Sequence, residues 1–197
     1  HQRLVKIRKN LLKTVLYFDP TTVEGLNSFY FLIYFTTTYY PITAGILPIF
    51  RMNSELSRKV AFAYHHLLIH NPKEAMSFLI HSVKYMDIDK STSQIINIKE
   101  EGFAQAYEEI KTKNKNKKRW AHLNELYDVN SDEFKSIQEI AKYYQSKNLQ
   151  LNTASMNGHI FSFKEITSRI MINEINTIMT LITPLIKKIG KNANNMD

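Results

Sequence analysis

The spacing of apolar residues along this chain is mostly that of helices. Between residues 3 and 18, apolar side chains recur at every third or fourth position, and basic residues fill much of the remainder. This pattern predicts a basic amphipathic helix over residues 3–18. Asp19-Pro20 ends the helix, because the residue before a proline is disfavoured in the α region.

A long segment without any charged side chain follows, at residues 25–50. A threonine at position 21 or 22 can cap the helix that opens this segment, and Pro41 breaks that helix. The pattern therefore predicts a helix over about residues 26–40, followed by a bent connector over residues 42–50.

Clear start and stop signals divide the middle of the chain. A tight helical hairpin is predicted from residues 56–70, capped by Asn53 or Ser54, and residues 72–86, because Asn71-Pro72 ends one helix and caps the next. A polar turn then leads to a helical pattern over residues 94–113. A further capped helix is predicted over residues 132–147.

The last quarter of the chain holds a polar segment and a second hydrophobic run. Asn157-Gly158 is a turn signal between apolar residues, which allows a small hairpin within residues 148–161. A capping box at Ser162 precedes a run that is apolar on two sides, which predicts a long helix over residues 163–189. Residues 191–197 are predicted to form a disordered tail.

We therefore predict an all-α fold in a single helical domain that covers residues 1–190. The fold is expected to be an irregular bundle of about six or seven helices, because no strand pattern competes with the helical ones. Two long hydrophobic helices, at about residues 26–40 and 163–189, are predicted to lie at its centre.

The uncharged segment allows three interpretations. It could be a kinked transmembrane helix, a hydrophobic hairpin in one leaflet, or a central helix buried in protein, since about 20 apolar residues suffice to cross a bilayer. Its tyrosines, threonines and prolines favour protein or water on one side. The residues predicted to contact a membrane or a partner are Phe29, Phe31, Leu32, Ile33, Phe35, Tyr39, Tyr40, Ile46 and Leu47.

The chain of 197 residues carries a formal net charge of +8. Such a charge favours an anionic membrane, an acidic protein or a nucleic acid as partner, although a lysine- and asparagine-rich composition is also typical of an AT-rich genome. A solvated charge run is the simpler interpretation of residues 111–119. The residues predicted to bind an anionic surface are Arg3, Lys6, Lys9, Lys13, Lys111, Lys113, Lys115, Lys117, Lys118 and Arg119.

The sequence contains no motif for catalysis. It has no cysteine, which excludes disulfides, thiolate catalysis and cysteine-ligated metals within these residues. His66 and His70 have the spacing of a metal site on a helix, but no third ligand stands beside them. No glycine-rich phosphate loop and no serine-nucleophile motif is present. We therefore predict no catalytic residue, no metal, no cofactor and no small-molecule substrate.

These patterns lead to a predicted function without enzyme activity. The chain is expected to be a helical interaction or scaffold subunit of a larger assembly, membrane-associated, with residues 26–50 contributing to a membrane-inserted, pore or transport complex. Its predicted partners are other protein subunits and an anionic membrane, and the compartment is left open. The alternative is a basic nucleic-acid-binding helical module that uses the lysine run at residues 111–119.

Overall fold

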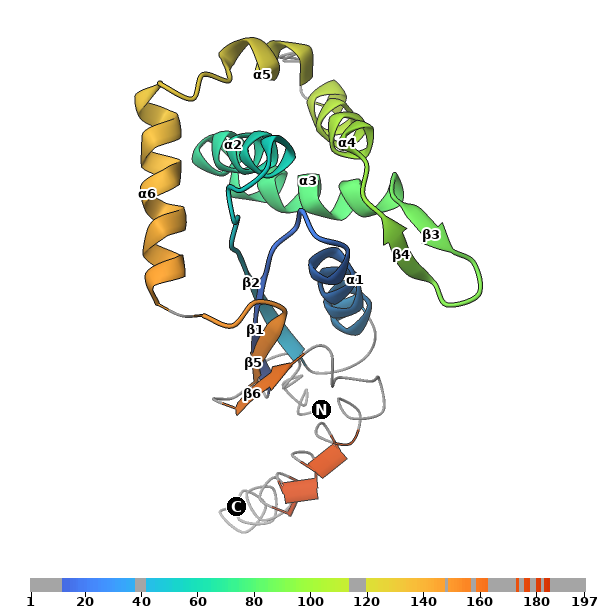
Figure 1. Cartoon of the computed structure of the whole chain (residues 1–197). Coiled ribbons are helices and arrows are strands. Elements are labelled where there is room, and N and C mark those ends of the chain that lie inside the picture. The colour runs from blue at the N-terminus through green and yellow to red at the C-terminus, as the bar shows by residue number, and fades with distance from the viewer. Residues whose placement is uncertain are drawn as a thin grey trace, which may run out of the picture.

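The computed structural model describes residues 12–37, 42–113, 120–147, 149–156 and 159–162, together with residues 173, 176–177, 180–181 and 183–184. Its organising element is a four-stranded sheet in the order β2-β1-β5-β6 (Figure 1). Strand β1 pairs in parallel with β2, whereas the pairs β1–β5 and β5–β6 are antiparallel. The four strands are β1 (Leu12–Phe18), β2 (Ile42–Pro48), β5 (Thr153–Met156) and β6 (His159–Ser162).

Helix α1 (Val23–Thr37) connects β1 to β2 and packs on one face of the sheet. Along β1, Thr14, Leu16 and Phe18 are buried, whereas Lys13 and Val15 on the opposite face are exposed. This alternation is that of a strand with one buried face. The ring of Phe18 stacks on that of Phe29 in α1, with 5.0 Å between the centroids. The contact fixes α1 against the sheet.

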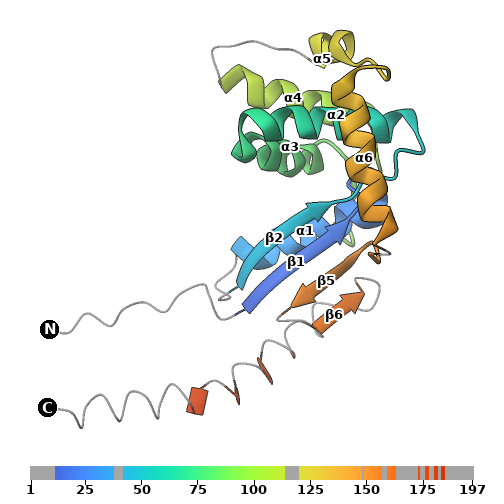
Figure 2. The same ribbon diagram turned by 90° about the vertical axis from the view of Figure 1, so that its left-hand side faces the viewer.

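The chain between β2 and β5 forms a helical insert, which Figure 2 shows gathered at one end of the sheet. A short hairpin interrupts its helices. The insert contains α2 (Glu55–His70), α3 (Pro72–Lys84), β3 (Asp87–Asp89), β4 (Gln94–Asn97), α4 (Glu100–Lys113), α5 (Trp120–Leu126) and α6 (Asp132–Ser146).

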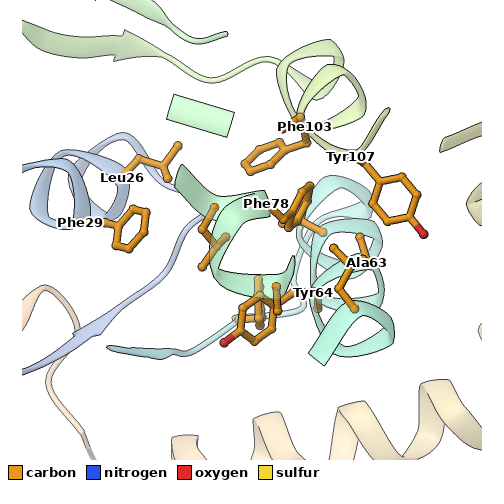
Figure 3. Close-up of a cluster of buried hydrophobic side chains, with 14 of the residues drawn as sticks. Leu26, Phe29, Ala63, Tyr64, Phe78, Phe103 and Tyr107 are labelled. Atoms are coloured by element: carbon orange, nitrogen blue, oxygen red, sulfur yellow. The ribbon is translucent and has the colours of Figure 1, made fainter. Parts of the chain in front are cut away.

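Aromatic side chains hold the insert together. Phe78 of α3 contacts Phe103 and Tyr107 of α4, with ring centroids 6.0 Å and 6.1 Å apart (Figure 3). Leu26 and Phe29 of α1 belong to the same buried cluster, so that the sheet and the insert share one core. Burial of large apolar side chains of this kind is the main stabilising contribution to a fold.

The prediction of an all-α bundle is wrong, because strands occupy several segments that were expected to be helical or connecting. Residues 12–18 form β1 rather than the end of a helix, residues 42–48 form β2 rather than a connector, and residues 94–97 form β4. Apolar residues three or four apart in 3–18 imitated a helix, whereas burial in β1 follows a period of two. The hairpin considered within residues 148–161 is present as β5 and β6, with Met156 opposite His159.

The predicted helical hairpin agrees with α2 and α3, and the helix predicted over residues 132–147 agrees with α6. Asn71 caps α3 through the Lys73 N–H, and Ser54 caps α2 through the Ser57 N–H. The predicted helix over residues 26–40 corresponds to α1. The first residues of the predicted helix 3–18, most of the predicted helix 163–189 and the predicted tail 191–197 lie outside the described residues.

The uncharged segment forms helix α1 and strand β2 of this fold, whereas a kinked transmembrane helix was one of its three interpretations. Within the described part of the chain, no helix has the length and apolar content needed to cross a bilayer. Helix α1 has 15 residues, which is about 22 Å at the rise of an α-helix and falls short of a hydrocarbon core of about 30 Å. Pro41 separates it from β2, a strand of the sheet.

Candidate functional site

A rigid turn joins the end of β1 to the start of α1. Asp19 is buried, and its Oδ1 accepts hydrogen bonds from the Thr21 N–H at 2.9 Å and from the Thr21 hydroxyl at 2.6 Å. The Thr22 hydroxyl accepts from the Gly25 N–H at 3.1 Å and donates to the Asp19 carbonyl at 2.9 Å. Thr22 is thus the N-cap of α1, as a threonine at this point of the sequence predicts.

Only glycine fits at the third helical position of α1. A Cβ atom on Gly25 would lie 1.9 Å from the carbonyl oxygen of Asp19 and 2.7 Å from its carbonyl carbon. Both atoms belong to the backbone, so a larger residue could be accommodated only if the whole turn moved. The first turn of α1 therefore lies directly against the turn that precedes it.

The loop before β5 lies beside this first helical turn. Asn152, in this loop, has a φ of 57°, a left-handed conformation that asparagine tolerates better than most residues. Its Nδ2 donates to Oε2 of Glu24 at 3.4 Å, and its Oδ1 is buried without a hydrogen-bond partner among the described residues. Residues 128 positions apart in the chain thus meet at one end of the sheet.

A cavity of about 560 Å³ opens next to this loop. The loop after β2, the end of α6 and the loop before β5 form its walls. The Ile49 N–H donates to the Phe18 carbonyl at 2.8 Å, so the cavity lies at the carboxyl ends of β1 and β2. Ligands of α/β proteins commonly bind at this edge of a parallel sheet. The lining residues are Ile49, Arg51, Asn53, Tyr144, Gln145, Leu149 and Leu151.

The pKa values of two neighbouring side chains of α2, Tyr64 and His65, are shifted in the direction that favours their neutral forms. Burial raises the pKa of the Tyr64 phenol, and the negative charge of an ionised Tyr144 would raise it further. Burial lowers the pKa of His65, and Glu133 opposes part of this effect. In the described part of the chain, no three His, Asp or Glu side chains are arranged to hold a metal ion. The cavity therefore offers shape, apolar contact, hydrogen bonds and the positive charge of Arg51.

The described residues among those predicted to contact a membrane or a partner are not part of the cavity lining. Phe29 and Leu32 are buried in the core, and Phe31, Ile33, Ile46 and Leu47 are partly buried. Of Phe35 only the backbone is described, and Tyr39 and Tyr40 lie outside the described residues.

The described residues of the predicted anionic surface are not among those that line the cavity. Lys13 lies on the exposed face of β1, and Lys111 and Lys113 are at the end of α4. The positions outside the described residues are Arg3, Lys6, Lys9, Lys115, Lys117, Lys118 and Arg119. Binding of an anionic surface by this set stays a prediction.

Comparison with known proteins identifies the fold. The model of a family described as a thioredoxin-like domain matches residues 1–191. The chain belongs to this family. Among solved structures, the thioredoxin-like domain is similar to the MdbA protein of Actinomyces oris, a thiol-disulfide oxidoreductase. The two share 18% identity over 79% of this chain and 75% of that one, with a TM-score of 0.51.

A second similar structure is the oxidoreductase DsbA from Xylella fastidiosa. It shares 13% identity with the thioredoxin-like domain, over 78% of this chain and 79% of that one, with a TM-score of 0.39. None of the curated proteins matches the sequence.

These findings correct the predicted function. The predictions of an all-α bundle and of a non-enzymatic, membrane-associated scaffold subunit are wrong, because a thioredoxin-like family model covers nearly all of the chain and a thiol-disulfide oxidoreductase shares its fold. What the comparisons show instead is a thioredoxin-like domain whose fold is shared with a thiol-disulfide oxidoreductase. The alternative of a basic nucleic-acid-binding helical module also has no support in this fold.

The thioredoxin-like domain lacks the redox motif associated with its fold. A C-x-x-C pair in such proteins lies at a helix N-terminus, where the thiolate is stabilised. A pair that begins at the N-cap of α1 would occupy Thr22 and Gly25, and the whole chain has no cysteine. Thr22 makes the cap bond, and Gly25 has no room for a side chain. Thiol–disulfide exchange by this chain alone is therefore chemically excluded.

Sequence reasoning missed the site because its parts are distant in the chain. The Asp19-Pro20 turn and the threonine cap were visible in the sequence, but they were interpreted as the end of one helix and the start of another. The pairing of Glu24 with Asn152 depends on the β1–β5 pairing. No local signal could have revealed it.

Proposed function

We propose that this thioredoxin-like domain binds an extended segment of a polypeptide substrate on behalf of an enzyme, and that the reacting groups lie outside these 197 residues. One observation carries the proposal: a cavity of about 560 Å³ at the carboxyl ends of the parallel strands, in a chain without cysteine. The cavity lies at the same end of the sheet as the turn between β1 and α1, where the fold could otherwise hold a redox pair.

The lining of the cavity favours a polypeptide over a small anion. Leucine, isoleucine and tyrosine side chains supply apolar contact, while Asn53 and Gln145 supply hydrogen bonds. This combination suits apolar side chains attached to an amide backbone, and the volume lies within the usual range of about 300–1,000 Å³ for ligand sites. The acidic residues Asp19 and Glu24 at the start of α1 disfavour a phosphate or another small anion there.

The relation to enzymes supports the second half of the proposal. The family and the fold shared with a thiol-disulfide oxidoreductase point to proteins that act on thiols and disulfides. Exchange requires a thiolate as the nucleophile. Since no thiolate can arise here, the domain would contribute substrate binding, and the thiols of any exchange would come from the substrate, another chain or another part of the protein.

Binding of labelled peptides tests this proposal. The probes are fluorescein-labelled peptides of about ten residues with a central Leu or Phe in a Gly-Ser-Thr background, with the extended conformation typical of bound segments. We expect fluorescence anisotropy to detect binding to the full chain, and Leu151→Asp to weaken it about tenfold, which corresponds to about 1.4 kcal/mol.

The control places the same new charge away from the cavity. Leu126→Asp changes an exposed leucine on α5 and should leave the affinity unchanged. Circular dichroism checks that both variants are folded. The proposal is contradicted if the wild-type chain binds no peptide, or if Leu151→Asp and Leu126→Asp bind equally well.

A further inference from the structure

We propose that Arg51 makes the cavity selective for a polypeptide segment that carries a carboxylate beside the apolar side chain. The inference rests on the proposed function and specifies the class of ligand. It follows from the position of Arg51 at the cavity, from the hydrogen-bonding capacity that its guanidinium group leaves open for a ligand, and from the charges around it.

The backbone of Arg51 is held in place at the cavity wall. Arg51 follows β2, and its carbonyl accepts a hydrogen bond from Nε2 of Gln145 at 3.4 Å. This bond links the loop after β2 to the end of α6. The bond therefore connects two walls of the cavity, the loop after β2 and the end of α6, and holds the backbone of Arg51 between them.

The guanidinium group of Arg51 is available for a ligand. The side chain is exposed, and within the described residues no hydrogen bond or ion pair engages its nitrogen atoms. The neighbouring Arg58 differs, because its Nη1 donates to the Met52 carbonyl at 3.4 Å. An arginine fork pairs well with the two oxygens of a carboxylate.

The surrounding charges favour a carboxylate at this end of the cavity. Arg51 is the charged residue of the lining, and the others are neutral. Beyond Leu151, Asn152 contacts the acidic Glu24, which would repel a carboxylate. A bound segment would therefore place its acidic group at Arg51 and its apolar group between Ile49, Leu149 and Leu151.

The expected selectivity is modest, because Arg51 is exposed to solvent. An exposed ion pair contributes about 0.2–1 kcal/mol, which corresponds to about a 1.4- to 5-fold change in affinity. Salt screens such a pair strongly, so the selectivity should shrink when the ionic strength rises from about 0.05 M to about 0.5 M.

Two pairs of peptides and three variants of the full chain test the inference. In the first pair, an Asp next to the central Leu is replaced by Asn; in the second pair, the Leu is followed by a free or an amidated C-terminus. The variants are Arg51→Gln, Arg51→Glu and the control Lys142→Gln, which removes the same charge from an exposed position on α6.

We expect the wild-type chain to prefer the Asp or the free-carboxylate peptide about 1.4- to 5-fold at low salt. Arg51→Gln should abolish this preference, Arg51→Glu should reverse it, and Lys142→Gln should retain it. The first peptide pair reports an acidic side chain and the second a chain terminus, so the pair that responds identifies the source of the carboxylate.

Two outcomes would overturn the inference, and they can be told apart. If all four peptides bind equally to the wild type and to Arg51→Glu, the role of Arg51 is wrong while the polypeptide-binding function stands. If none of the peptides binds the wild type, the proposed function fails and the inference fails with it.

Discussion

The turn between β1 and α1 depends on what single residues can and cannot provide. The carboxylate and carbonyl of Asp19 accept the hydrogen bonds of the turn, and Thr22 caps the N-terminus of α1. Gly25 allows the first turn of α1 to lie against the backbone of Asp19. Each of these residues is needed for a different physical reason: a buried hydrogen-bond acceptor, a cap, and the absence of a Cβ atom. The site can therefore be tested by single substitutions.

Gly25→Ala should destabilise the protein by about 3 kcal/mol, the upper part of the usual range for overpacking. The new Cβ would lie 1.9 Å from the Asp19 carbonyl oxygen, which belongs to the backbone and cannot rotate away. The free energy of unfolding in urea measures the effect. Gly45→Ala is the matched control, because its nearest neighbour is 3.8 Å from the added carbon. Equal stability of the two variants would contradict this account of the turn.

At the scale of elements, the sequence predicted helices well and strands poorly. The caps at Ser54 and Asn71 are local, since each side chain bonds to a backbone N–H two or three residues later. The strands depend on partners elsewhere: β1 pairs with β2 across α1 and with β5 across the helical insert. A strand of about seven residues carries too few positions for its period to be distinguished from that of a helix.

The β3–β4 hairpin is attached to α1 by one asparagine. Oδ1 of Asn27 accepts from the Ile95 N–H at 2.8 Å, and its Nδ2 donates to the Ile95 carbonyl at 2.9 Å. The side-chain amide thus bonds to β4 as a neighbouring strand would. Ile95 is almost completely buried, so water cannot easily replace the two bonds.

Asn27→Ala should therefore cost about 2–3 kcal/mol, because it removes two hydrogen bonds and leaves two backbone groups without partners. Amide hydrogen exchange should accelerate in the hairpin before it does so in α2 or α3. Asn97→Ala is the control: its bond to Asp87 is exposed, and its loss should change stability by less than about 0.5 kcal/mol. Unchanged exchange in the hairpin of Asn27→Ala would refute the anchoring role.

The packing of α2 makes stability depend on pH. His65 lies against the rings of Phe50 and Tyr64, and burial lowers its pKa from 6.5, with Glu133 of α6 opposing part of this effect. His66 lies nearby, with its Nδ1 3.5 Å from Glu133. The unfolded chain takes up a proton on His65 more readily than the folded one. The free energy of unfolding therefore keeps its full value above pH 6.5 and falls as the pH drops through this value.

Replacement of His65 by Gln should reduce this loss of stability between pH 7.5 and pH 5. Urea unfolding across this range measures it, and His70→Gln, at an exposed position on the same helix, is the control. The assignment to His65 fails if the pH dependence of His65→Gln equals that of the wild type.

At the scale of the whole molecule, the same fold can hold a redox pair or a surface for binding. The sequence already excluded thiol chemistry by side chains of these 197 residues, because none of them is a cysteine. It could not predict the cavity, whose walls come from residues 49–53, 144–145 and 149–151. These segments meet only when the helical insert folds back onto the sheet, and that arrangement depends on the shared core rather than on any local pattern.

This view predicts that restoring a C-x-x-C motif at α1 will not restore exchange. Thr22→Cys alone keeps room for its side chain, but the added Gly25→Cys brings the same backbone clash as Gly25→Ala. The double variant should lose about 3 kcal/mol of stability and should not catalyse the reduction of a peptide disulfide above the rate of free dithiothreitol. Thr22→Cys serves as the control that folds with a single thiol. A double variant that is as stable as the wild type and active in exchange would contradict this prediction. It would show that the turn tolerates a redox pair. The missing cysteines alone, rather than the shape of the site, would then separate this chain from a thiol-disulfide oxidoreductase.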